Sequence, residues 1–170
     1  MKEIWIKSRV DMAAIAEAEP GKYHILIIRD PNEEESPPGE PEFYQRKRET
    51  ICRAADSGMK NAKSYEVIYF HDFWQLSPGV ILATKEDIKK ALEYAEDKET
   101  LIVACAAGIS RSSATAYTIA RKNSSVSEAM SILNKEVHWP NPHVLNLGGE
   151  ILGLPLAKEI YDAGFERKPR

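Results

Sequence analysis

Short apolar runs alternate along the chain with segments whose apolar residues recur at helical spacing. Four runs have the length of strands, at residues 3–7, 24–28, 67–70 and 101–104. The run at 24–28 is followed by Asp30–Pro31, as is typical of a buried central strand that ends in a turn. This alternation predicts an α/β fold, with a mostly parallel central sheet that helices flank on both faces.

A helix is predicted in most of the intervening segments. The expected helices cover residues 12–18, capped by Asp11; 43–57, closed by Gly58; 85–97; the segment that precedes Lys122; 126–137; 144–152; and 158–163, closed by Gly164. Two of them begin with a capping box, Thr84 with Asp87 and Ser125 with Glu128. In a parallel sheet of this kind, ligands bind beyond the carboxyl ends of the strands.

The composition predicts one globular domain over residues 1–170. Of the 170 residues, 43% are hydrophobic and 29% are charged, which is ordinary for a folded domain. The segment 30–42, DPNEEESPPGEPE, is acidic and rich in proline and has few apolar residues, so we expect a surface loop there. The chain ends in a charged tail, ERKPR.

The charge balance bears on the possible partners. The chain has 23 basic and 26 acidic residues and a net charge of -3, so no overall basic field is available for nucleic acid or an anionic membrane. No run of about 18 apolar residues occurs, and the N-terminal sequence MKEIWIKSRVD lacks the apolar core of a signal peptide. We therefore expect a cytoplasmic protein without nucleic-acid or membrane partners.

The segment CAAGISRS, residues 105–112, follows the last predicted strand and opens a helix. Cys105 therefore lies at a strand-to-helix turn, where backbone N–H groups and the helix dipole favour an anion and lower the pKa of a thiol. Arg111 follows six residues later, and its planar guanidinium can bind two phosphate oxygens. Gly108 is expected to need a positive φ or a close backbone approach, because the loop folds its N–H groups inward.

The spacing Cys-x-x-Gly-x-x-Arg-Ser resembles the signature of the cysteine-based protein phosphatases, His-Cys-x-x-Gly-x-x-Arg-Ser/Thr, in particular the dual-specificity and compact bacterial tyrosine phosphatase-like members. The resemblance covers roughly residues 67–152 and includes a Pro-Asn element at 140–141. It implies a dual-specificity-phosphatase-like fold with the cysteine loop at the strand-to-helix turn. Ala104 stands where the family usually has histidine, a departure expected to loosen the loop or raise the pKa of the thiol.

Hydrolysis of a phosphate monoester gives each residue of this loop a predicted role. The Cys105 thiolate attacks phosphorus and forms a phosphocysteine intermediate. The predicted substrate-binding set, which would also hold phosphate, sulfate or vanadate, comprises Ala106, Ala107, Gly108, Ile109, Ser110 and Arg111. The resemblance implies that Ser112 donates a hydrogen bond to the Cys105 sulfur, and the alternative is an ordinary residue of the first helical turn.

The leaving group needs a proton from a carboxyl group on a different segment. Asp72 is the predicted general acid, because it follows a predicted strand and precedes Cys105 by a separation similar to that in dual-specificity phosphatases. The other aspartates considered, Asp56, Asp87 and Asp97, have competing explanations as helix or surface residues.

No metal or cofactor is expected. The mechanism needs none. A metal cluster could combine Asp72 with His71, His138 and His143, but these histidines lack the spacing that metal sites use. The second cysteine, Cys52, lies in a helical pattern without an arginine clamp, which favours a packing role over redox pairing with Cys105.

The sequence thus predicts a phosphomonoester hydrolase, with phosphotyrosine in proteins as the expected substrate and dual specificity as an option. Its loop lacks the lysines expected of a site for highly charged inositol phosphates, although a non-protein phosphate ester remains an alternative. Sulfur transfer or arsenate reduction also uses a cysteine at an anion loop, but Gly-x-x-Arg-Ser favours the phosphatase. A phosphate-binding module with weak turnover is the alternative that Ala104 motivates.

Overall fold

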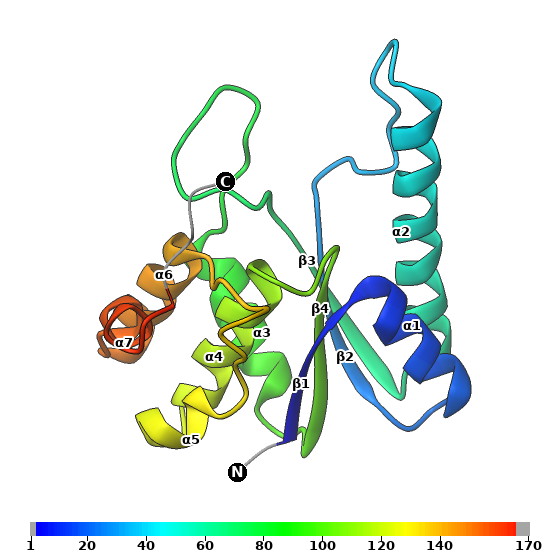
Figure 1. The fold of residues 1–170 in the computed structure, drawn as a ribbon. Helices are drawn as coiled ribbons and strands as arrows, with labels where there is room; N and C mark the ends of the chain where they lie inside the picture. Colours follow the sequence, from blue (N-terminus) through cyan, green and yellow to red (C-terminus); the bar gives the residue numbers. More distant parts are fainter. Residues whose placement is uncertain (1–2, 166–170) are drawn as a thin grey trace.

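The computed structural model describes residues 3–165. Its strands and helices alternate for most of the chain (Figure 1). In order they are β1 (Glu3–Ser8), α1 (Arg9–Ala18), β2 (His24–Arg29), α2 (Glu42–Asn61), β3 (Ser64–Tyr69), α3 (Lys85–Ala95), β4 (Thr100–Cys105), α4 (Arg111–Arg121), α5 (Val126–Met130), α6 (Pro142–Leu152) and α7 (Leu156–Asp162). The predicted charged tail lies outside the described residues.

The four strands form one parallel sheet in the order β1-β4-β2-β3, so the predicted parallel sheet is confirmed. β4 lies between β1 and β2, with Cys105 beside Ser8 and Ala104 beside Ile27. The carboxyl ends of the strands therefore bring four segments to one edge: the start of α1, the segment after β2, the segment after β3 and the cysteine loop. This edge is where an α/β sheet binds ligands.

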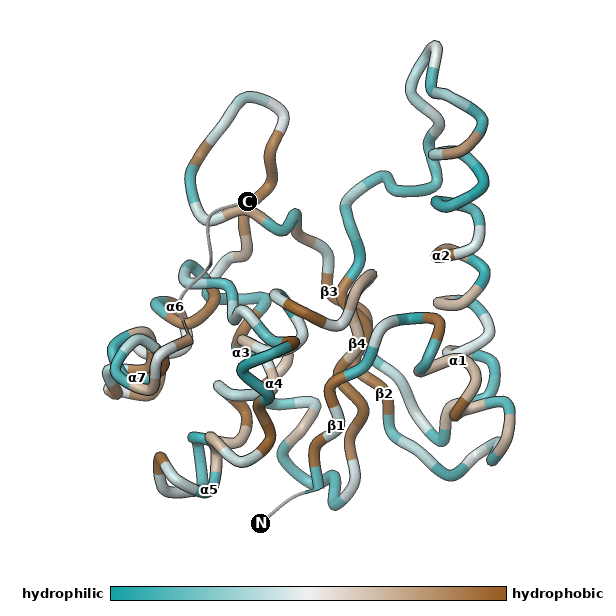
Figure 2. The backbone as a smooth tube through the Cα atoms, viewed as in Figure 1, coloured by the Kyte–Doolittle hydropathy of each residue, from teal (hydrophilic) through white to brown (hydrophobic). Residues whose placement is uncertain are grey.

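Helices cover both faces of the sheet, as the alternation predicted. α1 and α2 pack on one face, and α3 to α7 gather on the other (Figure 1). The strands are the most hydrophobic part of the chain, whereas the connecting loops are mainly polar (Figure 2). Because side chains alternate across a strand, Ala104 joins the core under α1 and α2, and Cys105 joins the larger core under α3 and α4.

Two predicted caps are wrong. Ser8, not Asp11, caps α1, because its Oγ accepts the backbone N–H of Asp11, which lies in the first turn. Gly58 does not end α2, which continues to Asn61. Gly58 is instead buried in the helix, where a Cβ would overlap the end of the Met12 side chain, so the glycine allows α2 to approach α1.

The helix predicted over 126–137 is also shorter than expected, because α5 ends at Met130. Polar side chains then bind nearby backbone groups instead of continuing the helix: Ser131 donates to Glu128 O at 2.6 Å, and Asn134 Oδ1 accepts Glu136 N–H at 2.9 Å. Val137 is therefore exposed rather than part of a core face. The two predicted capping boxes are confirmed at α3 and α5.

Candidate active site

The loop of residues 106–110 joins β4 to α4 at the carboxyl edge of the sheet. Gly108 in this loop has a φ of +71°, and a Cβ there would lie 2.5 Å from the backbone nitrogen of Ser8. The sequence predicted a positive φ or a close backbone approach at this position, and the structure has both. The loop is pressed against the end of β1, so only glycine fits.

The backbone N–H groups of this loop are available to bind an anion. Within residues 3–165, the N–H groups of Ala106 to Ser110 donate no hydrogen bond. No side chain caps the start of α4 either, so the positive end of that helix is unsatisfied. Consecutive free N–H groups beside a helix N-terminus form a binding site for phosphate-like oxygens.

Arg111 begins α4 with its guanidinium buried, at 4% exposure. Its Nη1 donates to Asp30 Oδ1 at 2.6 Å and to the carbonyl oxygen of Phe70 at 2.9 Å. Its Nε is buried and has no partner among the described residues. A buried unpaired donor costs about 1–3 kcal/mol, and an incoming oxyanion would remove that cost.

Cys105 ends β4 and is almost fully buried, at 3% exposure. Its Sγ lies 3.1 Å from Ser112 Oγ, within the first turn of α4. Ser112 is fully buried, so water does not compete for its hydroxyl group. The sulfur thus has a hydroxyl partner available to stabilise a thiolate.

Asp72 lies after β3 and reaches the cysteine loop from a separate segment. Its Oδ1 accepts hydrogen bonds from Ser110 Oγ at 2.8 Å and from Asn141 Nδ2 at 2.9 Å. The other candidate aspartates have different contacts: Asp87 forms the capping box of α3, Asp56 lies 3.7 Å from Arg29, and Asp97 pairs with Lys98. Of these four aspartates, Asp72 is the one that forms a hydrogen bond with a residue of the cysteine loop, Ser110.

Two residues at this site were missed by the sequence interpretation. Asp30 binds Arg111, and Asn141 binds Asp72. Asp30 follows a predicted strand just as Asp72 does, so its position beyond a carboxyl end was a usable signal. Asn141 was noticed only as part of a Pro-Asn element, and nothing in the sequence pairs it with Asp72.

The remaining candidates lie apart from this constellation. Cys52 is half-buried on α2, 3.9 Å from the carbonyl oxygen of Glu33, and burial raises the pKa of its thiol. The histidines contact separate backbone groups: His71 that of Ile81, His138 that of Asn134 and His143 that of Ala83. Among residues 3–165, no group of three or more His, Cys, Asp or Glu is arranged to hold a metal ion.

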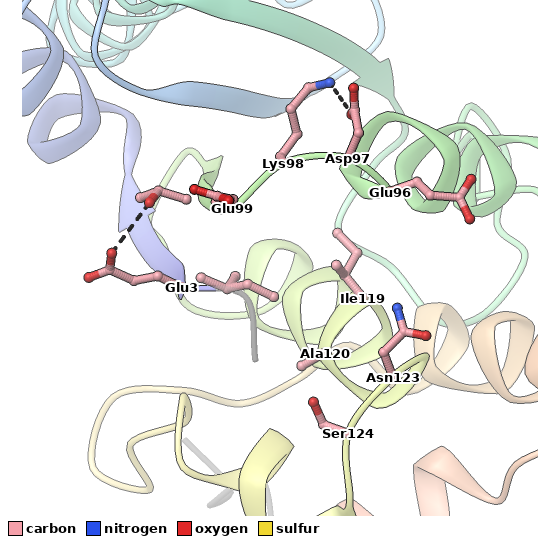
Figure 3. A pocket seen from close by; sticks show the side chains of 11 residues that line it. Glu3, Glu96, Asp97, Lys98, Glu99, Ile119, Ala120, Asn123 and Ser124 are labelled. Atoms are coloured by element: carbon pink, nitrogen blue, oxygen red, sulfur yellow. Dashed lines mark hydrogen bonds and ion pairs between the residues drawn. The ribbon is translucent and has the colours of Figure 1, made fainter.

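A surface cavity of about 620 Å³ lies at the opposite end of the sheet (Figure 3). It is lined by the amino ends of β1 and β4, including Glu3 and Thr100, whereas Cys105 ends β4. This cavity is therefore not part of the candidate site. In the described part of the chain, no helix is both long and apolar enough to cross a bilayer.

No protein-family model and no curated protein sequence matches this chain. Solved structures are similar to it. The crystal structure of Tk-PTP in the active form matches with a TM-score of 0.50 and 11% identity, over 90% of this chain and 93% of that chain. That of PTPMT1 in complex with PI(5)P matches with a TM-score of 0.50 and 14% identity, over 95% of each chain. The chain therefore has the fold of the cysteine-based phosphatases, as the loop motif predicted.

Proposed function

We propose that this protein hydrolyses phosphate monoesters through a phosphocysteine intermediate on Cys105. The observation that carries the proposal is the buried Arg111, whose unpartnered Nε lies at the start of α4, next to a loop of free backbone N–H groups. Such an arrangement leaves several donors without acceptors among the described residues. A bound phosphate supplies oxygens to all of them at once.

In the first step, Cys105 Sγ attacks phosphorus and the bond between phosphorus and the leaving oxygen breaks. The electron pair of that bond stays on the leaving oxygen, which takes a proton from Asp72. Arg111 and the loop N–H groups hold the three non-bridging oxygens while charge shifts through the transition state. Because Asp30 and Phe70 occupy Nη1, the guanidinium keeps Nε and Nη2 for two of these oxygens.

In the second step, water attacks phosphorus and gives a proton to the Asp72 carboxylate, while the phosphorus–sulfur bond breaks. Phosphate is released and the sulfur leaves as a thiolate. Ser112 Oγ, 3.1 Å from Sγ, stabilises that thiolate by donating a hydrogen bond. Neither step changes an oxidation state, and water is the only co-reactant.

The proposed substrate is phosphotyrosine in a protein, with small aryl phosphates as model substrates. The loop presents Ala106, Ala107, Ile109 and Ser110, without the lysines that a polyanionic inositol phosphate would favour. The complex of PTPMT1 with PI(5)P makes a lipid phosphate the alternative to test. We further propose a single catalytic domain over residues 1–170, acting in the cytoplasm.

The test is hydrolysis of p-nitrophenyl phosphate and its inhibition by vanadate. Cys105→Ser is expected to abolish turnover but to retain vanadate or phosphate binding, because the loop donors and Arg111 remain. Cys52→Ser is the matched control and should keep wild-type activity, since the Cys52 sulfur lies on α2 and contacts Glu33 rather than the cysteine loop. Full activity of Cys105→Ser would refute the covalent mechanism.

A phosphate-binding module with weak turnover is the second candidate, and Ala104 favours it. This residue is fully buried in the core under α1 and α2, together with Met12 and Ile27. It supplies no polar group where the phosphatase signature has histidine. Tight vanadate binding by the wild-type protein without measurable hydrolysis of any aryl phosphate would favour this candidate over the enzyme.

A further inference from the structure

Asn141 is a buried polar residue that the proposed reaction does not use. It is 1% exposed and lies at the start of α6, between Pro140 and Pro142. Its Oδ1 accepts the backbone N–H groups of His143 and Val144, at 3.0 and 3.2 Å, and so caps the helix. Capping fixes the orientation of the amide, because an acceptor must face those two donors.

With Oδ1 committed to the helix, Nδ2 must point toward the segment after β3. It donates to Asp72 Oδ1 at 2.9 Å and to the carbonyl oxygen of Phe73 at 3.1 Å. The flanking prolines restrict the backbone around Asn141, and burial restricts its side chain. The amide is therefore a rigid link between α6 and the segment that carries the proposed general acid.

Ser110 adds a second donor to the same carboxylate oxygen, at 2.8 Å. Two donors on Oδ1 set the rotation of the Asp72 carboxyl group. Among the described residues, no donor reaches Oδ2, so this oxygen is the one available to carry the proton for the leaving group. A proton on Oδ2 is also favoured chemically, because Oδ1 already accepts two hydrogen bonds.

The loop that carries Asp72 is held at its base as well. His71 and Ile81 exchange backbone and side-chain hydrogen bonds at 2.8 and 2.9 Å. His143, in the first turn of α6, lies 2.8 Å from the carbonyl oxygen of Ala83 through its Nε2. The start of α6 thus contacts both ends of the 71–83 segment, whose middle, residues 73–79, is exposed. In Figure 1 this segment projects from the molecule as an open loop.

We infer that Asn141 and Ser110 are positioning residues, which hold the Asp72 carboxyl group beside the phosphate loop before any substrate binds. This inference rests on the proposed function. The general acid then needs no large loop movement to reach the leaving oxygen. Removing either donor frees Asp72 to rotate, so protonation of the leaving group becomes less efficient while phosphate binding is retained.

Asn141→Ser tests this role, because serine can cap a helix but its short side chain does not supply the Nδ2 donor. We expect kcat/KM for phenyl phosphate to fall about 10- to 100-fold in this variant, less than the full contribution of about 10²- to 10⁴-fold from a general acid, because Asp72 is displaced but still present. For 2,4-dinitrophenyl phosphate, whose leaving group needs little protonation, the loss should be under about 3-fold. Asn146→Ser, an exposed change on the same helix, is the control.

A double-mutant cycle separates positioning from a purely structural effect. If Asn141 acts through Asp72, then adding Asn141→Ser to Asp72→Asn should cause almost no further loss. An equal loss for both leaving groups, additive losses in the cycle, or unchanged kinetics would each overturn the inference. Failure of the proposed function looks different, since the wild-type protein would then show no Cys105-dependent hydrolysis of either substrate.

Discussion

At the residue scale, the Arg111 guanidinium is anchored through Nη1 and, in the proposed mechanism, binds phosphate through its other nitrogens. Asp30 and the Phe70 carbonyl hold Nη1, so the planar group presents its remaining donors in a fixed direction. We predict that Arg111→Lys lowers kcat/KM for p-nitrophenyl phosphate by at least about 100-fold, because an ammonium cannot replace the bidentate contact. Steady-state kinetics of the purified variant measure this. Near-normal activity would mean that Arg111 only supports the helix.

Residues within the cysteine loop were predictable because one local turn brings them together. Cys105, Gly108 and Arg111 lie within seven consecutive positions, so their spacing already implies their geometry. Asp30 and Asn141 were missed for the opposite reason. They are 81 and 69 positions from their partners, and only the strand order and the packing of α6 create those contacts.

At the element scale, α6 matters because it carries Asn141 to the site. A Cβ on Gly149 of this helix would lie 2.6 Å from the carbonyl oxygen of Leu154, a backbone atom that cannot easily move. We predict that Gly149→Ala lowers the free energy of unfolding by about 1–3 kcal/mol. This is contrary to the gain of about 1 kcal/mol that alanine gives in an open helix. Urea unfolding measures it, and a stabilised variant would contradict the close approach.

Contacts between elements also limit what the sequence could predict about helices and strands. Strands were located well because each is an apolar run, although β3 begins at Ser64, three residues before the predicted start. The role predicted for Gly58 was wrong, because a glycine that ends a helix and one that lets two helices touch look the same in a sequence. Only the position of Met12 on α1 separates these two roles.

At the scale of the whole molecule, a buried ionic cluster links the layers to the site. Glu33, 8% exposed in its side chain, accepts two hydrogen bonds of 2.8 Å from Arg9, at the start of α1, and also pairs with Arg29 at the end of β2. Its Oε2 accepts the backbone N–H of Asp30 at 3.1 Å, and Asp30 in turn binds Arg111. The acidic segment predicted as a surface loop therefore also anchors Arg111.

The pH dependence of stability follows from this cluster. Burial raises the pKa of Glu33, but the hydrogen bonds and charges of Arg9 and Arg29 outweigh burial and bring the pKa below its usual value. A carboxyl group with a lowered pKa in the folded state stabilises the fold at pH values above its unfolded pKa of about 4.3. That contribution is lost as the pH falls through the folded pKa, when the carboxylate takes up a proton.

Glu33→Gln should therefore be destabilised most at neutral pH. We expect the free energy of unfolding at pH 7 to fall by about 3–5 kcal/mol, because the fully buried Arg9 loses the carboxylate that pairs with it. Arg29 keeps its pairs with Glu34 and Asp56. The difference from the wild-type protein should narrow as the pH falls below the unfolded pKa of about 4.3, because the unfolded chain then takes up a proton, and it should be smallest below the lowered pKa of folded Glu33. Urea unfolding of both proteins between pH 3 and pH 7 measures this. A difference that is constant over this range would show that the carboxylate charge does not stabilise the cluster.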